Sequence, residues 1–263
     1  MGRVLAVANQ KGGVGKTTTA INLAASLAVM EQRVLIVDCD PQGNASRGLG
    51  VDADGGHLYH VLTGQAEPRQ AARASGFPFL DVLPAGRDLV GVEVEFVGLD
   101  RWQWRLKSAL ATIRDDYAIV LLDCPPSLGH LTVNALVAAD AVIVPLQCEY
   151  FALEGISALI STVGRIRSTM NPGLYIAGIL LTMHDERTNL SKDVAREVRQ
   201  HFGDLVFTTI VPRNVRLAEA PSFGVPVLGH DIKSRGAQAY LTLAREVIGG
   251  RPGAASMAGG NHE

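Results

Sequence analysis

Residues 9–18 decide the fold of this chain: they read Asn9-Gln10-Lys11-Gly12-Gly13-Val14-Gly15-Lys16-Thr17-Thr18. A short apolar run comes directly before this stretch, and a longer segment with helical periodicity follows it. Glycines let such a loop curl until its N–H groups point inward at phosphate oxygens, and the N-terminus of the next helix adds positive potential. The stretch therefore predicts a phosphate-binding loop between a strand and a helix.

Two side chains of this loop have roles that their chemistry predicts. Lys16 would reach the β- and γ-phosphates of a nucleotide, and the Thr17 hydroxyl would ligate Mg²⁺. One position departs from the usual G-x-x-x-x-G-K-[ST] pattern, because Gln10 replaces its first glycine, and Lys11 adds a second lysine. The nucleotide-binding residues predicted in this loop are Lys11, Gly12, Gly13, Val14, Gly15, Lys16, Thr17 and Thr18.

Acidic residues end two further strand-like runs. Asp38 closes the first and is followed by Asp40, while Asp123 closes the run Ile-Val-Leu-Leu at residues 119–122. We expect Asp123 to hold Mg²⁺ through a water and Asp38 to support the magnesium shell. A lone acid at a strand end is more often a helix cap or a solvated group, but three of them beside a phosphate loop favour a catalytic site.

The whole chain alternates short β-branched runs with longer helix-period segments, which predicts an α/β fold. We expect one domain with a mostly parallel, twisted sheet that helices flank on both faces, because runs such as 119–122 are apolar throughout. The predicted strands are residues 3–9, 33–38, 79–84, 118–123, 141–146, 175–182 and 206–211. The predicted helices are residues 17–30, 102–115, 132–139, 153–170, 191–202 and 235–248.

Composition limits the class of protein. The chain has 263 residues, 47% of them hydrophobic, and a net charge of −2, so it lacks the overall positive field of a constitutive nucleic-acid binder. Its three cysteines have no C-x-x-C spacing, which favours a reducing cytoplasm. No apolar run is long enough to span a membrane, and the loop starts too early to leave room for a signal peptide. We expect one domain at residues 1–250 and a disordered tail at 251–263.

The loop at residues 9–18 resembles the deviant Walker A motif of the ParA/MinD superfamily of P-loop ATPases. The resemblance implies an ATPase that uses ATP and Mg²⁺, with Lys11 in the position of the family's signature lysine. In that family the signature lysine crosses a sandwich dimer to the partner's phosphates, so Lys11 and Lys16 would both be catalytic. Asp40 matches the family's second acidic motif, which implies that it orients the attacking water.

Further stretches are similar to the chromosomal ParA, or Soj-like, branch of this superfamily. They are residues 38–50, 123–127, 146–155, 187–190 and 211–224. The resemblance implies a partitioning ATPase in the cytoplasm, associated with the nucleoid. Its ATP-bound homodimer would bind double-stranded DNA without sequence preference. A ParB-like centromere-binding partner would stimulate its slow hydrolysis, and no membrane partner is implied.

The DNA-binding residues are expected where this branch places its DNA contacts. Arg187 and Arg216 are the first candidates, and Lys233 and Arg235 are secondary ones. Acidic residues are interleaved with the basic ones in this region, so the pattern by itself is more typical of a solvated helix face, and the family resemblance is what favours Arg187 and Arg216. Contacts of this kind would read phosphate charge and not base sequence.

Two other features have predicted places. Pro212, Arg213 and Asn214 follow the last strand, where we expect the adenine base to lie. Trp102 shares an apolar helix face and is expected to pack in the core, whereas Trp104 has either a core or a dimer-interface role.

Three alternatives remain open. A MinD-like ATPase would act at the membrane, although the tail lacks the basic amphipathic helix that such proteins use. An iron–sulfur protein of the superfamily would need cysteines placed to bridge a cluster, and this spacing is absent. An ATPase that positions a protein cargo in place of DNA is not distinguished by the sequence.

Overall fold

The computed structural model describes residues 2–149 and 152–249 and shows one eight-stranded sheet in the order β3-β4-β2-β5-β1-β6-β7-β8. Every neighbouring pair is parallel except β3 and β4. The prediction of a mostly parallel sheet is therefore confirmed. The strands are β1 (Arg3–Val7), β2 (Val34–Asp38), β3 (Arg73–Ala74), β4 (Leu80–Leu83), β5 (Ile119–Asp123), β6 (Ala141–Gln147), β7 (Tyr175–His184) and β8 (Val206–Pro212).

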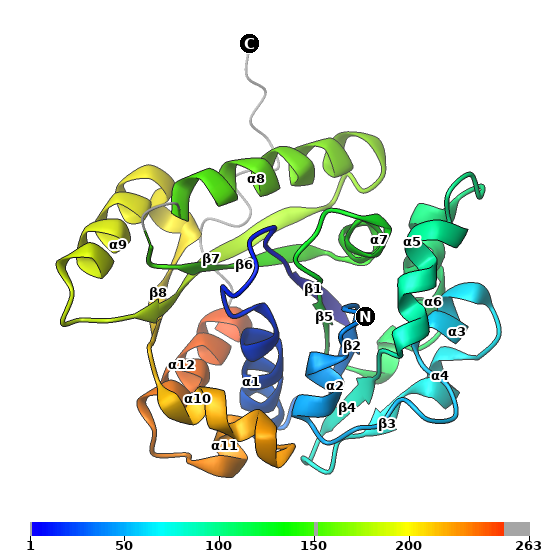
Figure 1. Cartoon of the computed structure of the whole chain (residues 1–263), viewed down its shortest axis with the longest axis horizontal. Coiled ribbons are helices and arrows are strands. Elements are labelled where there is room, and N and C mark those ends of the chain that lie inside the picture. Colours follow the sequence, from blue (N-terminus) through cyan, green and yellow to red (C-terminus); the bar gives the residue numbers. More distant parts are fainter. Residues whose placement is uncertain (1, 150–151, 250–263) are drawn as a thin grey trace.

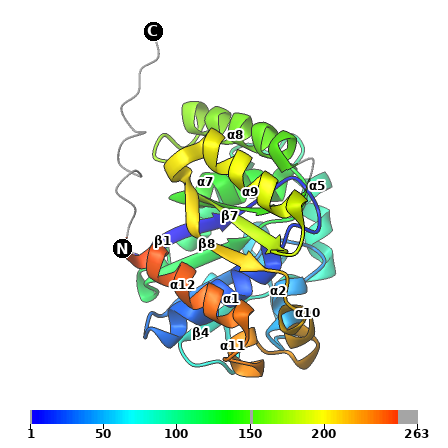
Figure 2. The same cartoon turned by 90° about the vertical axis from the view of Figure 1, so that its left-hand side faces the viewer.

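Helices cover both faces of the sheet, as Figures 1 and 2 show. Side chains alternate along β1, so that Val4 and Ala6 pack into one core and Leu5 and Val7 into the other. Both cores are dry and apolar, which explains why the strands are hydrophobic throughout. The Leu5 core is covered by α1 (Lys16–Val29), α2 (Asn44–Gly48), α10 (Val215–Glu219), α11 (Val227–His230) and α12 (Arg235–Gly249). The Val4 core is covered by α3 (Leu58–Thr63), α4 (Pro68–Ala71), α5 (Val92–Glu95), α6 (Arg105–Leu110), α7 (His130–Ala138), α8 (Ala152–Thr169) and α9 (Asn189–Phe202).

The strand order places the phosphate loop in the middle of the sheet. β1 lies between β5 and β6, and the loop leaves its carboxyl end to enter α1. In the register of the sheet Asp123 stands beside Val7 on one side and beside Asp38 on the other. The loop and the strand-end acids thus meet at one edge, where ligands bind in open parallel sheets.

One predicted helix is wrong in its extent. The sequence predicts a helix over residues 102–115, but the structure has a 3₁₀ turn at Trp102–Trp104, the short α6, and a second 3₁₀ turn at Arg114–Asp116. In the second turn the Arg114 side chain donates to the Gly2 carbonyl oxygen at 3.0 Å, which ties this part of the chain to the start of β1. Both tryptophans are partly buried against the Val4 core. The packing role expected for Trp102 is confirmed.

The sequence also missed several short elements, among them the two-residue β3 and the helices α2 to α5, α10 and α11. Segments of four to six residues are too short to show a clear periodicity. The predicted tail at residues 251–263 lies outside the described residues.

Candidate functional site

The phosphate loop is held open by distant side chains. Gly13 and Gly15 have φ angles of 75° and 88°, a left-handed conformation that disfavours other residues. The Asn9 side chain donates to the Pro145 carbonyl oxygen at 2.7 Å and accepts from the Lys11 N–H at 3.0 Å. The Thr182 hydroxyl donates to the carbonyl oxygen of Val14 at 2.8 Å. β6 and β7 therefore shape the loop before any ligand binds, which the loop sequence alone could not show.

Lys16 closes this loop. Its side chain is buried, and its Nζ donates to the Lys11 carbonyl oxygen at 2.9 Å. Burial lowers the pKa of Lys16, an effect that Asp123, Cys124 and Asp40 partly offset. A neutral carbonyl oxygen compensates an ammonium poorly, so the site favours an anion such as a phosphate group.

Asp123 is a fully buried acid whose two carboxylate oxygens lack a hydrogen-bond partner with normal geometry among the described residues. Burial raises its pKa strongly, the charge of Asp38 raises it further, and the nearby Thr17 hydroxyl and Lys16 ammonium oppose the shift. Such orphaned oxygens fit a cation or its bound water.

The described residues contain no group of three His, Cys, Asp or Glu side chains that would hold a metal by itself. A cation at Asp123 therefore needs ligands such as the Thr17 hydroxyl, water and phosphate oxygens. That ligand set is typical of Mg²⁺, which keeps several waters and is bound with the phosphates of its substrate. The residues present thus fit magnesium that arrives with a nucleotide.

Asp38 organises the loop after β2. Its carboxylate accepts hydrogen bonds from the N–H and hydroxyl of Ser46, at 2.9 and 2.7 Å, and from the N–H of Asp40 at 3.2 Å. Burial raises its pKa to about 6, against the lowering effect of these bonds. Because its oxygens already have three donors, its role in a magnesium shell stays a prediction. Ser46, which the sequence did not single out, also accepts from the Ala85 N–H at 3.1 Å.

Asp40 lies at the same edge with 8% of its surface exposed. One of its carboxylate oxygens accepts from the Gln42 N–H at 2.9 Å, which turns the loop toward α2. It lies near enough to Lys16 to raise the pKa of that ammonium. The structure thus brings Asp40 to the phosphate loop, and its role as the residue that orients water stays a prediction.

Lys11 and Lys16 occupy different environments although they belong to one loop. The Lys11 side chain turns outward and pairs with Glu149 at 3.3 Å, and both side chains are partly exposed. Glu149 lies just beyond β6 and has no local signal that would identify it as a partner of the loop. The ion pair holds the Lys11 ammonium at the surface of the site, away from the interior of its own loop.

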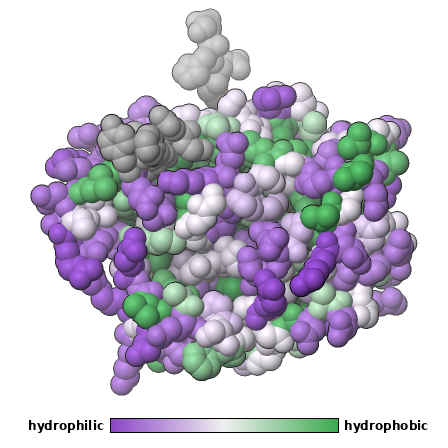
Figure 3. Space-filling model, viewed as in Figure 1, coloured by the Kyte–Doolittle hydropathy of each residue, from purple (hydrophilic) through white to green (hydrophobic). Residues whose placement is uncertain are grey.

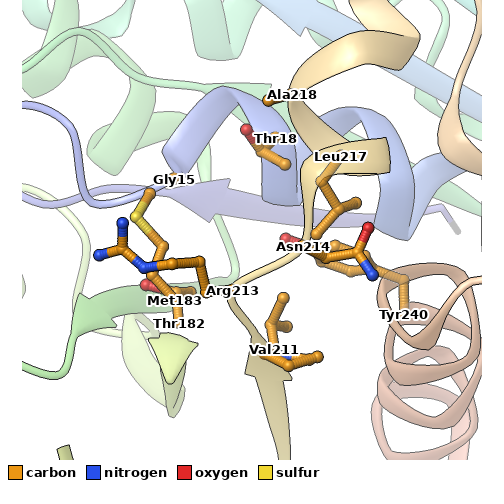
Figure 4. A pocket seen from close by; sticks show the side chains of 11 residues that line it. Gly15, Thr18, Thr182, Met183, Val211, Arg213, Asn214, Leu217, Ala218 and Tyr240 are labelled. Atoms are coloured by element: carbon orange, nitrogen blue, oxygen red, sulfur yellow. The ribbon is translucent and has the colours of Figure 1, made fainter. Parts of the chain in front are cut away.

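Pro212, Arg213 and Asn214 line a cavity of ≈ 230 Å³ together with Gly15 and Thr18 (Figure 4). The sequence prediction places the adenine base beside these three residues, and the structure brings them to the same edge as the phosphate loop. The cavity is too small for a whole nucleotide, so it suits the part of one that extends beyond the phosphates. The remaining lining residues are Thr182, Met183, Val211, Leu217, Ala218 and Tyr240.

The four predicted DNA-binding residues, Arg187, Arg216, Lys233 and Arg235, are called the arginine surface below. Lys233 and Arg235 line a groove of ≈ 430 Å³ with Glu186, the neighbour of Arg187, so these parts of the chain converge. Each arginine already contacts a carboxylate. The pairs are Arg187–Asp185 at 2.8 Å, Arg216–Glu219 at 2.8 Å, Arg216–Asp231 at 3.4 Å and Arg235–Glu186 at 3.0 Å.

The three cysteines, Cys39, Cys124 and Cys148, are buried free thiols. Burial raises the pKa of each, for Cys148 to about 11, so the reactive thiolate form is disfavoured. The prediction that Cys39 and Cys124 serve as small buried hydrophobes beside the site agrees with their 1% exposure.

Among residues 2–149 and 152–249, no helix is long and apolar enough to cross a bilayer.

Comparisons with known proteins identify the family. The AAA domain family model matches residues 2–176. The chain is 58% identical over 250 residues to the chromosome partitioning protein ParA of Caulobacter vibrioides, with 94% of each chain covered. It is 51% identical over 249 residues to the sporulation initiation inhibitor protein Soj of Bacillus subtilis, covering 94% of this chain and 98% of that protein.

Among solved structures, one from Mycobacterium smegmatis has a TM-score of 0.83 and 39% identity, covering 94% of this chain and 95% of the other. That protein is described as cobyrinic acid a,c-diamide synthase, and its structure contains an ATP analogue and magnesium. These ligands are the cofactors that the loop sequence predicts. The phosphate loop at residues 9–18 and the strand-end acids indicate the same family as the identity to ParA and Soj over 94% of the chain. The chain belongs to the ParA/Soj family of P-loop ATPases.

Proposed function

We propose that this chain is a partitioning ATPase whose ATP-bound homodimer binds double-stranded DNA without sequence preference. A ParB-like centromere-binding partner would stimulate hydrolysis and return the subunits to monomers. The observation that carries the proposal is the contrast between the two lysines of the phosphate loop. Lys16 is buried over its own loop, whereas Lys11 is held at the surface by Glu149.

The ATPase half follows from the buried charges at the sheet edge. Lys16 would neutralise phosphate charge, Thr17 and Asp123 would hold hydrated magnesium, and Asp40 would orient the attacking water. Magnesium would supply charge neutralisation on the phosphate oxygens. The cavity at Pro212, Arg213 and Asn214 receives the base. The pattern of orphaned Asp123 oxygens and a poorly compensated Lys16 supports these roles, since both groups gain partners when the nucleotide binds.

The position of Lys11 supports the proposed dimerisation. A cation that stabilises charge on the transferred phosphoryl group from a second subunit is an efficient way to couple assembly to hydrolysis. Lys11 is poorly placed to serve its own loop, because its ammonium pairs with Glu149 at 3.3 Å. In the proposed dimer Lys11 leaves this carboxylate and contacts the phosphates of the partner subunit. The ion pair is partly exposed, so breaking it costs little.

DNA binding follows from the arginine surface. One subunit offers only a few phosphate contacts, and its arginines are already paired with carboxylates, so a monomer binds duplex DNA weakly. A dimer doubles the number of contacts on one duplex and raises the affinity through effective concentration. ATP would thereby switch DNA binding on. The name of the Caulobacter relative, a chromosome partitioning protein, supports the partitioning role. The proposed location, in the cytoplasm on the nucleoid, goes with that role.

The proposal is tested by retardation of an arbitrary duplex DNA in the presence of ATP, ADP or no nucleotide. We expect retardation with ATP only, and we expect the double variant Arg187→Ala, Arg216→Ala to abolish it while ATP-driven dimerisation persists. The matched control is Arg69→Ala, because Arg69 is an exposed arginine of α4 that pairs with Asp116, away from the arginine surface. Retardation that is equal in all three nucleotide states would contradict the switch. Equal losses in the control and the double variant would contradict the assigned surface.

A further inference from the structure

An exposed apolar surface surrounds α5. Val90, Val94, Val97 and Leu99 are 60%, 75%, 66% and 41% exposed, and we call these four residues the valine surface. Figure 3 shows hydrophobic side chains gathered over α5 on the face of the molecule that is turned toward the viewer. Single exposed apolar residues are ordinary, but four within ten positions form a patch of the kind that is typical of interaction sites.

The valine surface is carried by a firmly packed segment. Leu89, Val92 and Phe96 alternate with the exposed residues and are at most 1% exposed in the Val4 core. The Arg105 guanidinium lies over the Phe96 ring, 5.1 Å from its centre. The exposed side chains are therefore the outer face of an anchored turn, which pre-orders them for contact with a partner.

Glu93 joins this segment to α7. Its carboxylate accepts hydrogen bonds from the N–H groups of His130 and Leu131, at 2.9 and 3.3 Å, and contacts the His130 ring nitrogen Nδ1 at 3.0 Å. Gly129 leaves the room for it, because a Cβ atom there would lie 2.5 Å from a carboxylate oxygen of Glu93. Burial raises the pKa of Glu93, but the hydrogen bonds from His130 and Leu131 outweigh it and the net shift is downward. Glu93 thus caps the start of α7 as a carboxylate.

The start of α7 is connected to the catalytic edge through residues 124–129. This loop leaves β5 at Asp123 and enters α7, and the Thr132 hydroxyl ties the two together by donating to the Ser127 carbonyl oxygen at 2.6 Å. A shift of α5 that moved the Glu93 carboxylate would therefore move the segment that leads to Asp123. Trp102 reports on the same place, since its ring meets the His130 ring edge-on with centroids 4.3 Å apart.

The position of α5 indicates which molecule covers it. In Figure 2 the phosphate loop before α1 and α5 both lie toward the right-hand side, and in Figure 1 both face the viewer. The valine surface, which α5 and its flanking residues carry, thus lies on the same side of the molecule as the phosphate loop that contains Lys11. A second copy of this chain, placed so that the two Lys11 side chains cross, brings its own sheet edge against this face.

We infer that a second copy of this chain covers the valine surface in the ATP-bound dimer, and that Glu93 transmits this contact to the Asp123 loop. The inference rests on the dimer of the proposed function and deepens it. Glu93 acts as a positioning residue: it touches neither nucleotide nor magnesium, and it sets the start of α7 from which residues 124–129 extend. Hydrolysis is then enabled only when the second copy is in place.

The surface is tested by Val94→Glu, with Val29→Glu as the matched control. Val29 is an exposed valine at the end of α1, roughly 20 Å along the helix from the phosphate loop. With magnesium and a non-hydrolysable ATP analogue, light scattering should show dimers for the unmodified chain and Val29→Glu. Val94→Glu should stay monomeric at a tenfold higher concentration and bind the analogue within about twofold. Val97→Glu repeats the test if Val94→Glu does not fold.

Dimers of Val94→Glu or Val97→Glu at the unmodified concentration would overturn the inference while leaving the proposed function intact. If the unmodified chain also remains monomeric with the analogue, the dimer of the proposed function fails, and the inference fails with it. The two failures are thus distinguished by the unmodified chain alone.

The positioning role is tested by Glu93→Gln in a Trp104→Phe background, where Trp102 is the remaining tryptophan. After dimerisation of this background is established, we expect the ATP analogue to change Trp102 fluorescence as the dimer forms. Glu93→Gln should reduce this change and lower kcat about tenfold, with the affinity for ATP altered less than twofold. A merely structural Glu93 would lower the melting temperature and leave kcat and the fluorescence change intact, which would overturn the positioning role.

Discussion

The phosphate end of the sheet and the arginine surface differ in whether their charged side chains are buried and whether they are paired. At the phosphate end Lys16 and Asp123 are buried, one bonded to a neutral carbonyl oxygen and the other without a hydrogen-bond partner of normal geometry among the described residues. At the arginine surface the guanidinium groups of Arg187, Arg216 and Arg235 are exposed and each contacts a carboxylate. The first region has unsatisfied charges that a ligand completes, whereas the second has satisfied charges that a ligand must compete for.

This difference sets the scale of each binding event. A buried charge that gains its partner changes the binding free energy by about 2–5 kcal/mol, while an exposed ion pair contributes about 0.2–1 kcal/mol. Nucleotide binding by one subunit is therefore strong and depends on single residues. The proposed DNA binding would be a sum of small terms and would become strong only when a dimer doubles their number. A switch operated by ATP requires that one subunit binds nucleotide strongly and DNA weakly. If a monomer bound DNA tightly, ATP could not control DNA binding.

The largest effect is expected for Asp40→Ala. Loss of a carboxylate that positions and activates the attacking water typically lowers the rate by about 10²–10⁴-fold. In the proposed function Lys16, and not Asp40, binds the phosphates. We therefore expect Asp40→Ala to leave ATP binding intact, so that the dimer accumulates. Single-turnover hydrolysis and light scattering measure the two quantities. Monomers with bound ATP, or hydrolysis at the unmodified rate, would contradict the role of Asp40.

A somewhat smaller effect is expected for Lys16→Ala. Removing one partner of a buried charged contact costs about 2–5 kcal/mol, so the affinity for ATP should fall at least about 30-fold. Titration calorimetry with magnesium and ATP measures this change. Lys11→Ala is the matched control from the same loop: its side chain points outward to Glu149, so monomer affinity should change little while hydrolysis is lost. Similar affinity losses in the two variants would remove the contrast between the lysines.

The buried acids predict how stability depends on pH. Asp38 and Asp123 have pKa values raised above the unfolded value of about 3.9, so the folded chain holds more protons than the unfolded chain in this range. Their contribution to the free energy of unfolding is therefore fully present below about pH 4 and is lost as pH rises through about 6 and above. Asp123→Asn removes the buried charge, and we expect the nucleotide-free variant to be about 1–3 kcal/mol more stable than the unmodified chain at pH 8.

At pH 5 the two chains should differ less than at pH 8, because a raised pKa favours the protonated carboxyl of Asp123 as the pH falls. Urea unfolding in the presence of a chelator measures both values, and Asp115→Asn, at an exposed site, controls for the loss of charge alone. Stability differences of equal size at pH 5 and pH 8 would contradict a raised pKa at Asp123. In spite of its higher stability, Asp123→Asn should bind ATP no better with magnesium than without it.

The same contrast explains what the sequence could predict. The phosphate loop, the strand-end acids and the parallel sheet were predicted because each is recorded in a local pattern: glycine spacing, or an apolar run that ends in an acid. The partners of these groups were missed because they come from remote parts of the chain. The Thr182 hydroxyl on Val14 spans 168 positions and the pairing of Lys11 with Glu149 spans 138. No periodicity or spacing indicates that such residues meet.

Asp38 shows how the fold decides a role that residue type leaves open. The sequence placed it at the correct strand end, beside Asp123 in the register of the sheet. Its environment then depends on Ser46, eight residues later, which binds its carboxylate because α2 begins at Asn44 and turns back toward β2. Two acids at neighbouring strand ends thus acquire different states: one has three hydrogen-bond donors and the other has none with normal geometry among the described residues.

The smallest effect is expected at the arginine surface and tests the other half of the contrast. Asp185 accepts two hydrogen bonds from the Arg187 side chain, at 2.9 and 2.8 Å, and these bonds lower the pKa of Asp185. DNA phosphates must displace this carboxylate, so Asp185→Asn should raise DNA affinity in the ATP state by about two- to fivefold, the value of one exposed ion pair. Asp116→Asn, which breaks the Arg69 pair elsewhere on the molecule, should leave the affinity unchanged.

Salt dependence separates this explanation from a general gain of positive charge. Both variants raise the net charge by one unit, but only Asp185→Asn frees an arginine that is proposed to contact phosphate. Freeing Arg187 adds close to one phosphate contact per subunit, so the slope of log affinity against log salt concentration should steepen by about 0.9 for each subunit of the dimer. Filter binding between 50 and 200 mM salt measures this slope. If both variants raise the DNA affinity equally at every salt concentration, the carboxylates act only through the overall charge of the protein. The arginine surface would then bind DNA no differently from other exposed charges.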